Sequence, residues 1–370
     1  MKSFVNFVKK EAVLSAAALL AIVSAFFVPP DIKYAGYTDY RVIVLLFSLM
    51  LVVAAFKDVG MFTALGSRLL KHAKSTRSLA LILVFLCFFT SMFITNDVAL
   101  ITFVPFAVMM LSMTGQTGLM IPVITLQTIA ANLGSMLTPV GNPQNLYLYS
   151  TFHIPIQRFI LLMLPLSALS ALMLFIGVIL LKNTPLKNSG TPSEAHISSR
   201  FKTAVYIILF LVCTACVVHV IDYPIMLVIV VVTIFLCDRR LFKKVDYYLL
   251  LTFVCFFVFI GNMERIPAVS EAMNRLIADR ELLLGIGFSQ IISNVPAAIL
   301  LSGFTSNYVP LLYGVNIGGL GTLIASLASI ISYRGYCASD GAKKGRYVLV
   351  FTIYNLIFLA VLAFVGALLI

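Results

Sequence analysis

Long apolar runs occupy most of this 370-residue chain and leave few polar residues to cover a surface exposed to water. Hydrophobic residues make up 61% of the sequence and charged residues 11%, whereas soluble domains are roughly 25% charged. Several runs reach the roughly 20 residues with which a helix crosses a bilayer, and the alternating segments typical of a membrane barrel are absent. The sequence predicts an all-α polytopic membrane protein, with spans at 12–29, 41–56, 79–113, 119–150, 158–182, 203–221, 224–237, 246–262, 282–306, 308–333 and 346–370.

Two of these runs, 79–113 and 282–306, are interrupted by polar residues and carry no basic residue at their midpoint. Each is preceded by a segment with charges at irregular helical spacing, at 59–76 and 263–281, which we expect to lie along the membrane interface. A run with a polar centre can enter the membrane, turn and leave on the same side. We therefore predict an inward-opening re-entrant hairpin at 79–113 and an outward-opening one at 282–306.

The distribution of Lys and Arg favours this topology. If the N-terminus is cytoplasmic and both hairpins return to their own side, the cytoplasmic segments hold 20 of the 26 basic residues. This is the positive-inside pattern, and counting either hairpin as a full crossing destroys it. We expect a multi-pass protein of the inner or plasma membrane, with a retained first helix and an external C-terminus. The net charge of +12 lies in these loops, so no nucleic-acid partner is expected.

The chain repeats one order of elements: span, span, interfacial helix, hairpin, broken helix, span. The run from Asn132 to Gly141 aligns with the run from Asn316 to Ala325, and Thr95-Asn96-Asp97 aligns with Ser293-Asn294-Val295. These alignments predict two inverted-topology repeats, a plan in which transporters bind their substrate near the membrane midplane.

The predicted boundaries follow from this alignment. The first inverted repeat is 1–182 and contains the broken helix 119–150. The second is 224–370 and contains the broken helix 308–333. Residues 183–202, rich in Ser and Pro, form a cytoplasmic linker, and 203–223 form the extra span that reverses the second repeat.

Asp97 is the one formally charged side chain between Arg77 and Arg158, and the stretch between Glu281 and Arg334 has none. Burying a charge at membrane depth costs several kcal/mol, so an intramembrane carboxylate indicates a functional site by default. The alternative is that Asp97 caps the second arm of its hairpin by accepting backbone N–H groups. Both roles can hold at once.

The hairpin tips have the features of a binding site. The N–H groups that start the second arm, together with the helix macrodipole, attract an anion without Lys or Arg. The carbonyl groups that end the first arm have the opposite polarity, which suits Na+. Short polar side chains at Thr95, Asn96, Ser293 and Asn294 can add hydrogen bonds.

The broken helices supply the remaining candidates. Pro139 and Pro143 remove N–H donors from the first, whereas the second is interrupted by Gly residues, which can also serve close helix packing. The predicted substrate- and ion-binding residues are Thr95, Asn96, Asp97, Asn132, Gly134, Ser135, Thr138, Pro139, Gly141, Asn142, Asn145, Ser293, Asn294, Asn316, Gly318, Gly319 and Thr322. Na+ is expected near Asn96, Asn132, Asn294 and Asn316.

Other chemistries find little support. The four His lie near span ends or in loops, and no nucleophile–base or phosphate-binding constellation is present, so neither an enzyme nor a resident cofactor is expected. Cys213 and Cys216 have metal-site spacing, but we interpret them as two small side chains on one helix face. A channel remains a remote alternative, because inverted repeats with twin hairpins suit alternating access.

At these residues the sequence resembles the ion transporter superfamily, and within it the citrate-transporter-like domain of arsenite permeases, sodium/proton antiporters and divalent anion–sodium symporters. The most specific part is the run from Asn132 to Asn145. The resemblance implies an elevator-type carrier, often homodimeric, that binds substrate and coupling ions between the two tips and the two broken helices.

Asp97 departs from the dicarboxylate carriers of this group, which have Ser-Asn-Thr at both tips. An acidic first tip resembles the arsenite permeases more closely. It would repel a carboxylate substrate unless protonated, and it suits proton coupling. We predict a secondary transporter of a small anion or oxyacid, either citrate-like or arsenite-like, coupled to H+ or Na+. A Na+/H+ antiporter is the alternative.

Overall fold

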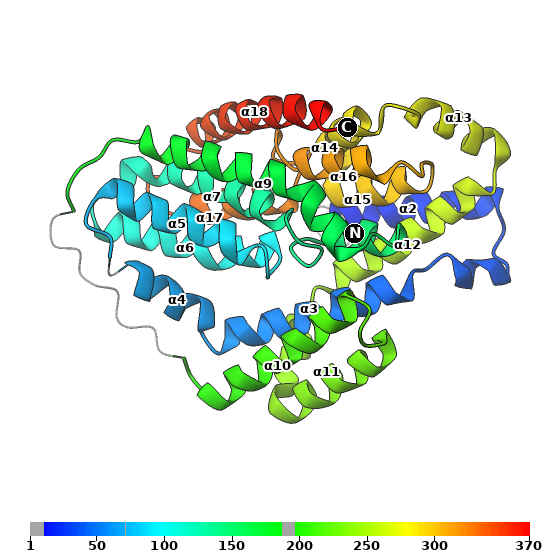
Figure 1. Cartoon of the computed structure of the whole chain (residues 1–370), viewed down its shortest axis with the longest axis horizontal. Helices are drawn as coiled ribbons and strands as arrows, with labels where there is room; N and C mark the ends of the chain where they lie inside the picture. Colours follow the sequence, from blue (N-terminus) through cyan, green and yellow to red (C-terminus); the bar gives the residue numbers. More distant parts are fainter. Residues whose placement is uncertain (1–10, 71, 187–196) are drawn as a thin grey trace, which may run out of the picture.

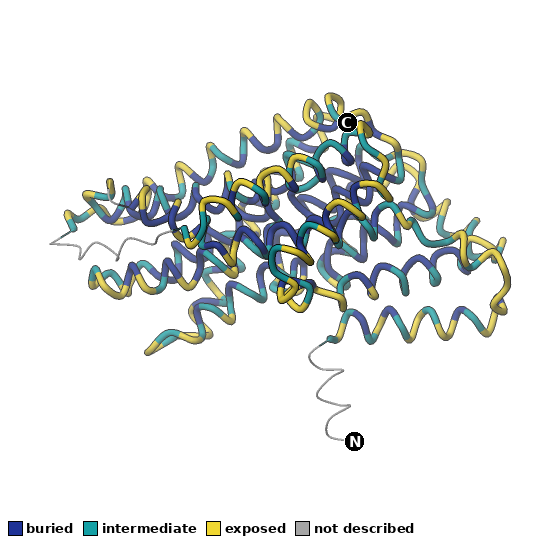
Figure 2. The backbone as a smooth tube through the Cα atoms, turned by 90° about the horizontal axis from the view of Figure 1, so that it is seen from below, coloured by how far each residue is buried: buried dark blue, intermediate teal, exposed yellow. Residues whose placement is uncertain are grey.

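The computed structural model describes residues 11–70, 72–186 and 197–370. This part of the chain is helical, with no strand beyond one isolated bridge between Ser75 and Pro185. Most helices lie close to the long axis of the molecule (Figure 1). Buried positions run through its middle, and exposed positions follow the outer sides of the peripheral helices (Figure 2).

Within these described ranges, seven helical stretches are long and apolar enough to cross a membrane. They are α3 (Tyr40–Asp58), α6 (Asn96–Met113), η2 (Thr117–Leu119) continued by α7 (Met120–Ser135), α9 (Ile156–Ile179), α10 (Arg200–Val217), α12 (Tyr247–Glu264) and α18 (Lys344–Leu368). Large apolar side chains such as Phe26, Leu236 and Phe364 are exposed on the outside, where a polytopic membrane protein contacts lipid. The predicted all-α polytopic class is therefore confirmed.

The helices pack as two groups. The first helix group contains α3, α10 and α12 together with α2 (Ala12–Phe27) and α11 (Tyr223–Asp238). The second helix group contains α6, α7, α9 and α18 together with α5 (Thr76–Thr90), α8 (Pro143–Thr151), α14 (Glu281–Ile292), α15 (Asn294–Ser302), α16 (Tyr308–Ile317) and α17 (Leu327–Cys337). The groups touch where α3 packs on α8 and α12 packs on α15.

Two short helices connect the groups along the chain. The helix α4 (Met61–Leu70) leads from α3 to α5, and α13 (Pro267–Ile277) leads from α12 to α14 (Figure 1). They lie within the segments expected to be interfacial, 59–76 and 263–281. The predicted linker 183–202 makes the third connection, and its residues 187–196 lie outside the described residues, as does the basic segment before α2.

Each polar-interrupted run holds two helices with a short break between them. The runs 79–113 and 282–306 contain α5 with α6 and α14 with α15. The runs 119–150 and 308–333 contain α7 with α8 and α16 with α17. We call 136–142 the first break and 318–326 the second break. The turn between α14 and α15 is Ser293 alone, whose φ of 74° is rare for a residue other than Gly.

Candidate functional site

Asn132, near the end of α7, joins the first tip to the second break. Its Oδ1 accepts a hydrogen bond from Nδ2 of Asn96 at 2.9 Å and another from Oγ of Ser326 at 3.1 Å. Its Nδ2 donates to the carbonyl oxygen of Gly319 at 3.3 Å. Both polar atoms of one carboxamide are thus used to connect segments that are nearly 200 residues apart in the chain.

Asn316, near the end of α16, makes the corresponding connection to the start of α8. Its Oδ1 accepts from Nδ2 of Asn142 at 3.3 Å, and its Nδ2 donates to Oδ1 of Asn145 at 2.7 Å. Every side chain in these two networks is at most 4% exposed. We name them the amide cluster: Asn96, Asn132, Asn142, Asn145, Asn316 and Ser326.

The first tip is the turn 91–95 between α5 and α6, together with Asn96, and three contacts hold it against the first break and the end of α7. The backbone N–H of Asn96 donates to the carbonyl oxygen of Gly141 at 3.3 Å. The hydroxyl of Thr138 donates to the carbonyl oxygen of Met92. Gly134 lies so close to α5 that a Cβ there would be 2.6 Å from Oγ of Ser91.

The second tip contacts the second break in the same way, at the positions that the sequence aligns with those of the first. The N–H of Asn294 donates to the carbonyl oxygen of Ala325 at 3.0 Å. The hydroxyl of Thr322 donates to the backbone carbonyl oxygen of Gln290 at 3.4 Å. A Cβ at Gly318 would be 2.6 Å from Oγ of Ser289. In both copies the first N–H of the second arm is therefore already taken and is not free for an anion.

One carboxamide side chain also pins each break. In the first break Nδ2 of Asn145 donates to the carbonyl oxygens of Met136 at 3.1 Å and Thr138 at 3.3 Å. In the second break, Nε2 of Gln290 donates to the carbonyl oxygens of Gly318 at 2.9 Å and Leu320 at 3.0 Å. Each of these carbonyl oxygens therefore already accepts one N–H donor, which uses one of its two lone pairs.

Gln290→Met tests the importance of this bracing, because Met92 holds the aligned position in the first copy. The change removes both donated bonds and the bond that Oε1 accepts from the N–H of Thr322. At about 0.5 to 1.5 kcal/mol for each bond, we expect a clear fall in the thermal unfolding midpoint of the detergent-purified protein. Gln116→Met, at a loop side chain without such bonds, is the control. Equal midpoints for the two variants would contradict the bracing role.

Asp97 follows Asn96 but faces a different part of the molecule. It lines a cavity of about 530 Å³, the Asp97 cavity, between the two helix groups. Thr95 and Pro143 also border this cavity, and Lys57 and Lys244 lie among the charged residues that line it. Among the described residues its carboxylate has no hydrogen-bond or ion-pair partner. The capping alternative thus gains no support, since the N-cap residue of α6 is Thr95.

A second cavity of about 500 Å³, the Arg41 cavity, lies further along the same boundary. It is lined by residues that include Arg41, Glu264, His153 and His219. Tyr147 and Ser302 border it and join α8 to α15 through a 2.8 Å hydrogen bond between their hydroxyl groups. The Tyr147 ring packs against Phe253 and Phe257 of α12.

The predicted site residues therefore fall into separate sets. Asn96, Asn132, Asn142, Asn145 and Asn316 meet in the amide cluster, and Gly319 and Ser135 hydrogen-bond to its members. Thr95 and Asp97 face the Asp97 cavity. The remaining predicted residues lie in or beside the tips and breaks: Gly134, Thr138, Pro139, Gly141, Ser293, Asn294, Gly318 and Thr322. Of these, Thr322 is exposed.

Three polar residues of the site escaped the sequence analysis. Ser326 is the last residue of the second break, and Gln290 follows Ser289 near the end of α14, but neither belongs to the aligned motifs that the sequence singles out. Lys244 lies in a segment assigned to a cytoplasmic loop. Within the described residues, no group of three or more His, Cys, Asp or Glu is placed to hold a metal ion, and Cys213 and Cys216 are buried thiols.

A polytopic helical fold in which interrupted helices meet in a buried polar cluster defines a class of proteins, the membrane transporters. The chain belongs to the citrate transporter family, whose sequence pattern matches residues 4–307. It is therefore a transporter rather than an enzyme.

Named relatives agree with this assignment. The chain is 32% identical over 325 residues to an uncharacterized transporter of Methanocaldococcus jannaschii, with 88% of each chain covered. It is 32% identical over 330 residues to the inner membrane protein YbiR of Escherichia coli, with 85% of each covered. It is also 32% identical over 136 residues to the silicon efflux transporter LSI3 of Oryza sativa subsp. japonica, covering 36% of this chain and 27% of that protein.

Proposed function

We propose that this chain is a secondary transporter of a small oxyacid or anion, coupled to H+ or Na+. The observation that carries the proposal is Asp97, a carboxylate without a partner among the described residues, in a cavity one residue away from the amide cluster. A carboxylate in this setting can bind and release a cation while the neighbouring amides and hydroxyls contact the solute. We place the solute in the Asp97 cavity, beside Thr95 of the first tip and Pro143 at the start of α8.

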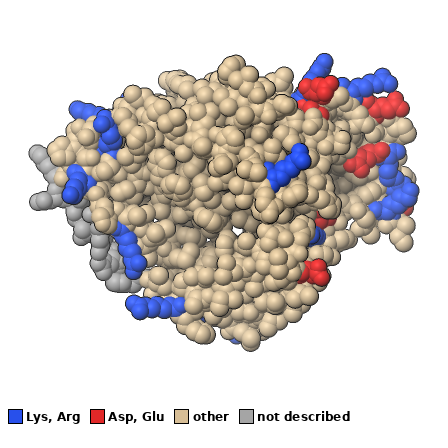
Figure 3. All heavy atoms as spheres, viewed as in Figure 1, with Lys and Arg blue, Asp and Glu red and all other residues tan. Residues whose placement is uncertain are grey.

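Two inverted repeats with re-entrant hairpins form the framework of this proposal. Its support is the set of three contacts that recur between tip and break at aligned positions. The charge pattern agrees, because on the face shown in Figure 3 one end carries Lys and Arg without Asp or Glu. We assign that end to the cytoplasm of a cell with this protein in its inner or plasma membrane, with the N-terminus inside and the C-terminus outside.

An elevator movement fits the division into two helix groups. The second helix group contains both tips and both breaks, and the described connections to the first group are the short helices α4 and α13. The Asp97 cavity and the Arg41 cavity both lie at the boundary along which such a movement would occur. A homodimer that holds the first helix groups together would give the moving group a fixed support.

Charge supports a choice between the two substrate classes. Asp58, Asp97 and Asp246 line the Asp97 cavity, and Asp58 forms an ion pair with Lys244. An anion as highly charged as citrate would be repelled there unless Asp97 is protonated or Lys57 compensates. A weakly acidic oxyacid avoids this repulsion, and one relative is named as a silicon efflux transporter. We therefore favour an oxyacid and keep the carboxylate, after which the family is named, as the alternative.

Proteoliposomes test the function. Uptake of arsenite, silicic acid, citrate and succinate is measured in parallel, with pH and Na+ gradients imposed separately. The double variant Asn96→Ala/Asn294→Ala removes both tip amides, and we expect it to lower uptake of the transported solute at least about tenfold, which corresponds to about 1.4 kcal/mol. The control is Asn274→Ala/Asn307→Ala, at two exposed positions. Wild-type uptake by the tip variant would exclude the two tip amides from a role in transport.

A Na+/H+ antiporter is the second candidate, favoured by Asp97, whose carboxylate has no hydrogen-bond or ion-pair partner among the described residues. In this case Asp97 exchanges the two cations and no solute is needed. A Na+ gradient imposed on solute-free proteoliposomes would then change the internal pH. Absence of such a change, with solute uptake present, excludes the antiporter.

A further inference from the structure

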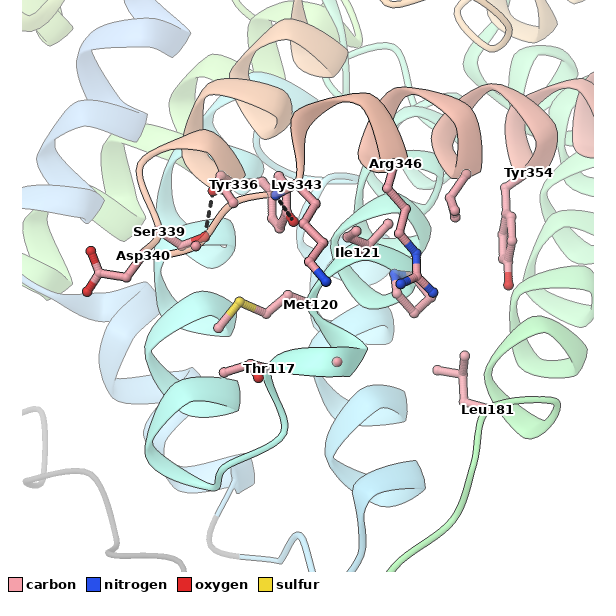
Figure 4. A pocket seen from close by; sticks show the side chains of 15 residues that line it. Thr117, Met120, Ile121, Leu181, Tyr336, Ser339, Asp340, Lys343, Arg346 and Tyr354 are labelled. Carbon is pink, nitrogen blue, oxygen red and sulfur yellow. Dashed lines mark hydrogen bonds between the residues drawn. The ribbon is translucent and has the colours of Figure 1, made fainter.

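A third cavity, of about 510 Å³, lies at the opposite end of α7 from the amide cluster. It is bordered by η2, the start of α7, the loop after α17 and the first turns of α18 (Figure 4). Met120 at its edge precedes Asn132 by about three turns of α7. The proposed transport site does not reach this cavity, so the cavity has no part in the proposed solute binding.

The polar part of this cavity is basic. Lys343 and Arg346 point into the space above Thr117, whereas the carboxylate of Asp340 points away from them (Figure 4). In the part of the chain that the structure describes, neither cation has an ion-pair partner. Hydroxyl groups of Thr117 and Ser339 also line the cavity. Two unpaired cations with hydroxyl groups beside them are suited to a phosphate group.

The rest of the cavity wall is apolar. Val350 and Tyr354 continue along α18, Ile121 and Pro122 come from α7, and Leu181 follows α9. Because α18 is a candidate membrane span that begins at Lys344, the two cations lie where it enters the membrane and the apolar wall lies deeper. A phospholipid has the same order, with its phosphate at the surface and its acyl chains below.

We propose that this cavity binds an anionic phospholipid, with the headgroup phosphate between Lys343 and Arg346 and an acyl chain along Val350 and Tyr354. Basic pockets between transmembrane helices bind anionic headgroups in this way. A free phosphate ion would use the cations but not the apolar wall. The bound lipid would bridge α7, α9 and α18, all of which belong to the second helix group.

Thermal unfolding of the full-length protein in detergent micelles tests the proposal. We expect phosphatidylglycerol to raise the unfolding midpoint of the wild type by about 3 °C or more, and phosphatidylcholine or inorganic phosphate to have little effect. The variant Lys343→Gln/Arg346→Gln should lose most of the shift. The variant Arg334→Gln/Lys344→Gln changes the charge equally at two exposed residues outside the cavity and should retain it.

Three results would overturn the proposal. The first is an undiminished phosphatidylglycerol shift in Lys343→Gln/Arg346→Gln. The second is an equal loss in Arg334→Gln/Lys344→Gln, which would indicate general surface charge. The third is an equal shift with inorganic phosphate, which would assign the cavity to a free ion. If Lys343→Gln/Arg346→Gln is poorly folded, Arg346→Lys, which keeps the charge, should preserve the shift.

Discussion

Asp97→Asn is expected to lower the coupled transport rate at least about tenfold and to remove its dependence on an imposed pH gradient. Asn has nearly the same shape but can neither release a proton nor hold a cation by charge. An ionisable group at membrane depth is retained for such a role. Since the Asp97 carboxylate has no hydrogen-bond or ion-pair partner among the described residues, its replacement by the similarly shaped Asn breaks no such bond there and the protein should fold normally.

The measurement is initial uptake into proteoliposomes at several pH gradients, with the amount of inserted protein determined in each preparation. Asp279→Asn is the matched control, because Asp279 is exposed, lies in a loop, and has a φ of 60° that Asn also tolerates. Wild-type rates and pH dependence in Asp97→Asn would exclude Asp97 from coupling. If uptake is Na+-dependent and unaffected by the change, the coupling ion binds elsewhere.

Gly134→Ala is expected to have the largest effect on stability. A Cβ at Gly134 would lie 2.1 Å from the carbonyl oxygen of Phe88, far inside contact distance. That oxygen belongs to the backbone of α5, so relief requires α5 and α7 to move apart. Overpacking of this kind typically costs about 1 to 3 kcal/mol, and here it also displaces the first tip, whose contacts depend on the position of α5.

Gly287→Ala, in α14, provides the control for Gly134→Ala. A Cβ at Gly287 meets no atom within 4 Å, and Ala is the better helix former by about 1 kcal/mol. We expect a lower unfolding midpoint and reduced yield for Gly134→Ala, and an unchanged or higher midpoint for Gly287→Ala. If the two variants unfold at the same temperature, α5 and α7 do not pack as described.

The fold class could be predicted because membrane helices leave strong local signals. Long apolar runs locate the helices, and Pro, Gly and Asn inside a run locate its interruption, so that 119–150 contains both α7 and α8. The predicted helix ends differ from the observed ones by a few residues, as at α18, where the sequence predicts 346–370 and Lys344–Leu368 is observed. The reason is that capping depends on the local backbone. The inverted orientation of the repeats and the dimer remain predictions.

The sequence could predict which residue types form the site, but not the direction in which each side chain points. Asn96 and Asp97 are neighbours in one tip, and the sequence treats them as one unit. In α6 successive side chains point about 100° apart, so Asn96 reaches Asn132 while Asp97 faces the cavity. Gln290 could not be found, because its partners are backbone carbonyls of a segment whose position only the tertiary structure defines.

The helix α8 borders the Asp97 cavity at Pro143 and the Arg41 cavity at Tyr147. These residues are about 6 Å apart along the helix axis. If water fills the two cavities from opposite sides of the membrane, they conduct like the solutions outside, and the membrane voltage falls mainly across this one turn. Each elementary charge that crosses it gains or loses about 2.3 kcal/mol per 100 mV. Under that condition the short insulating layer would concentrate the electric field next to the carboxylate of Asp97.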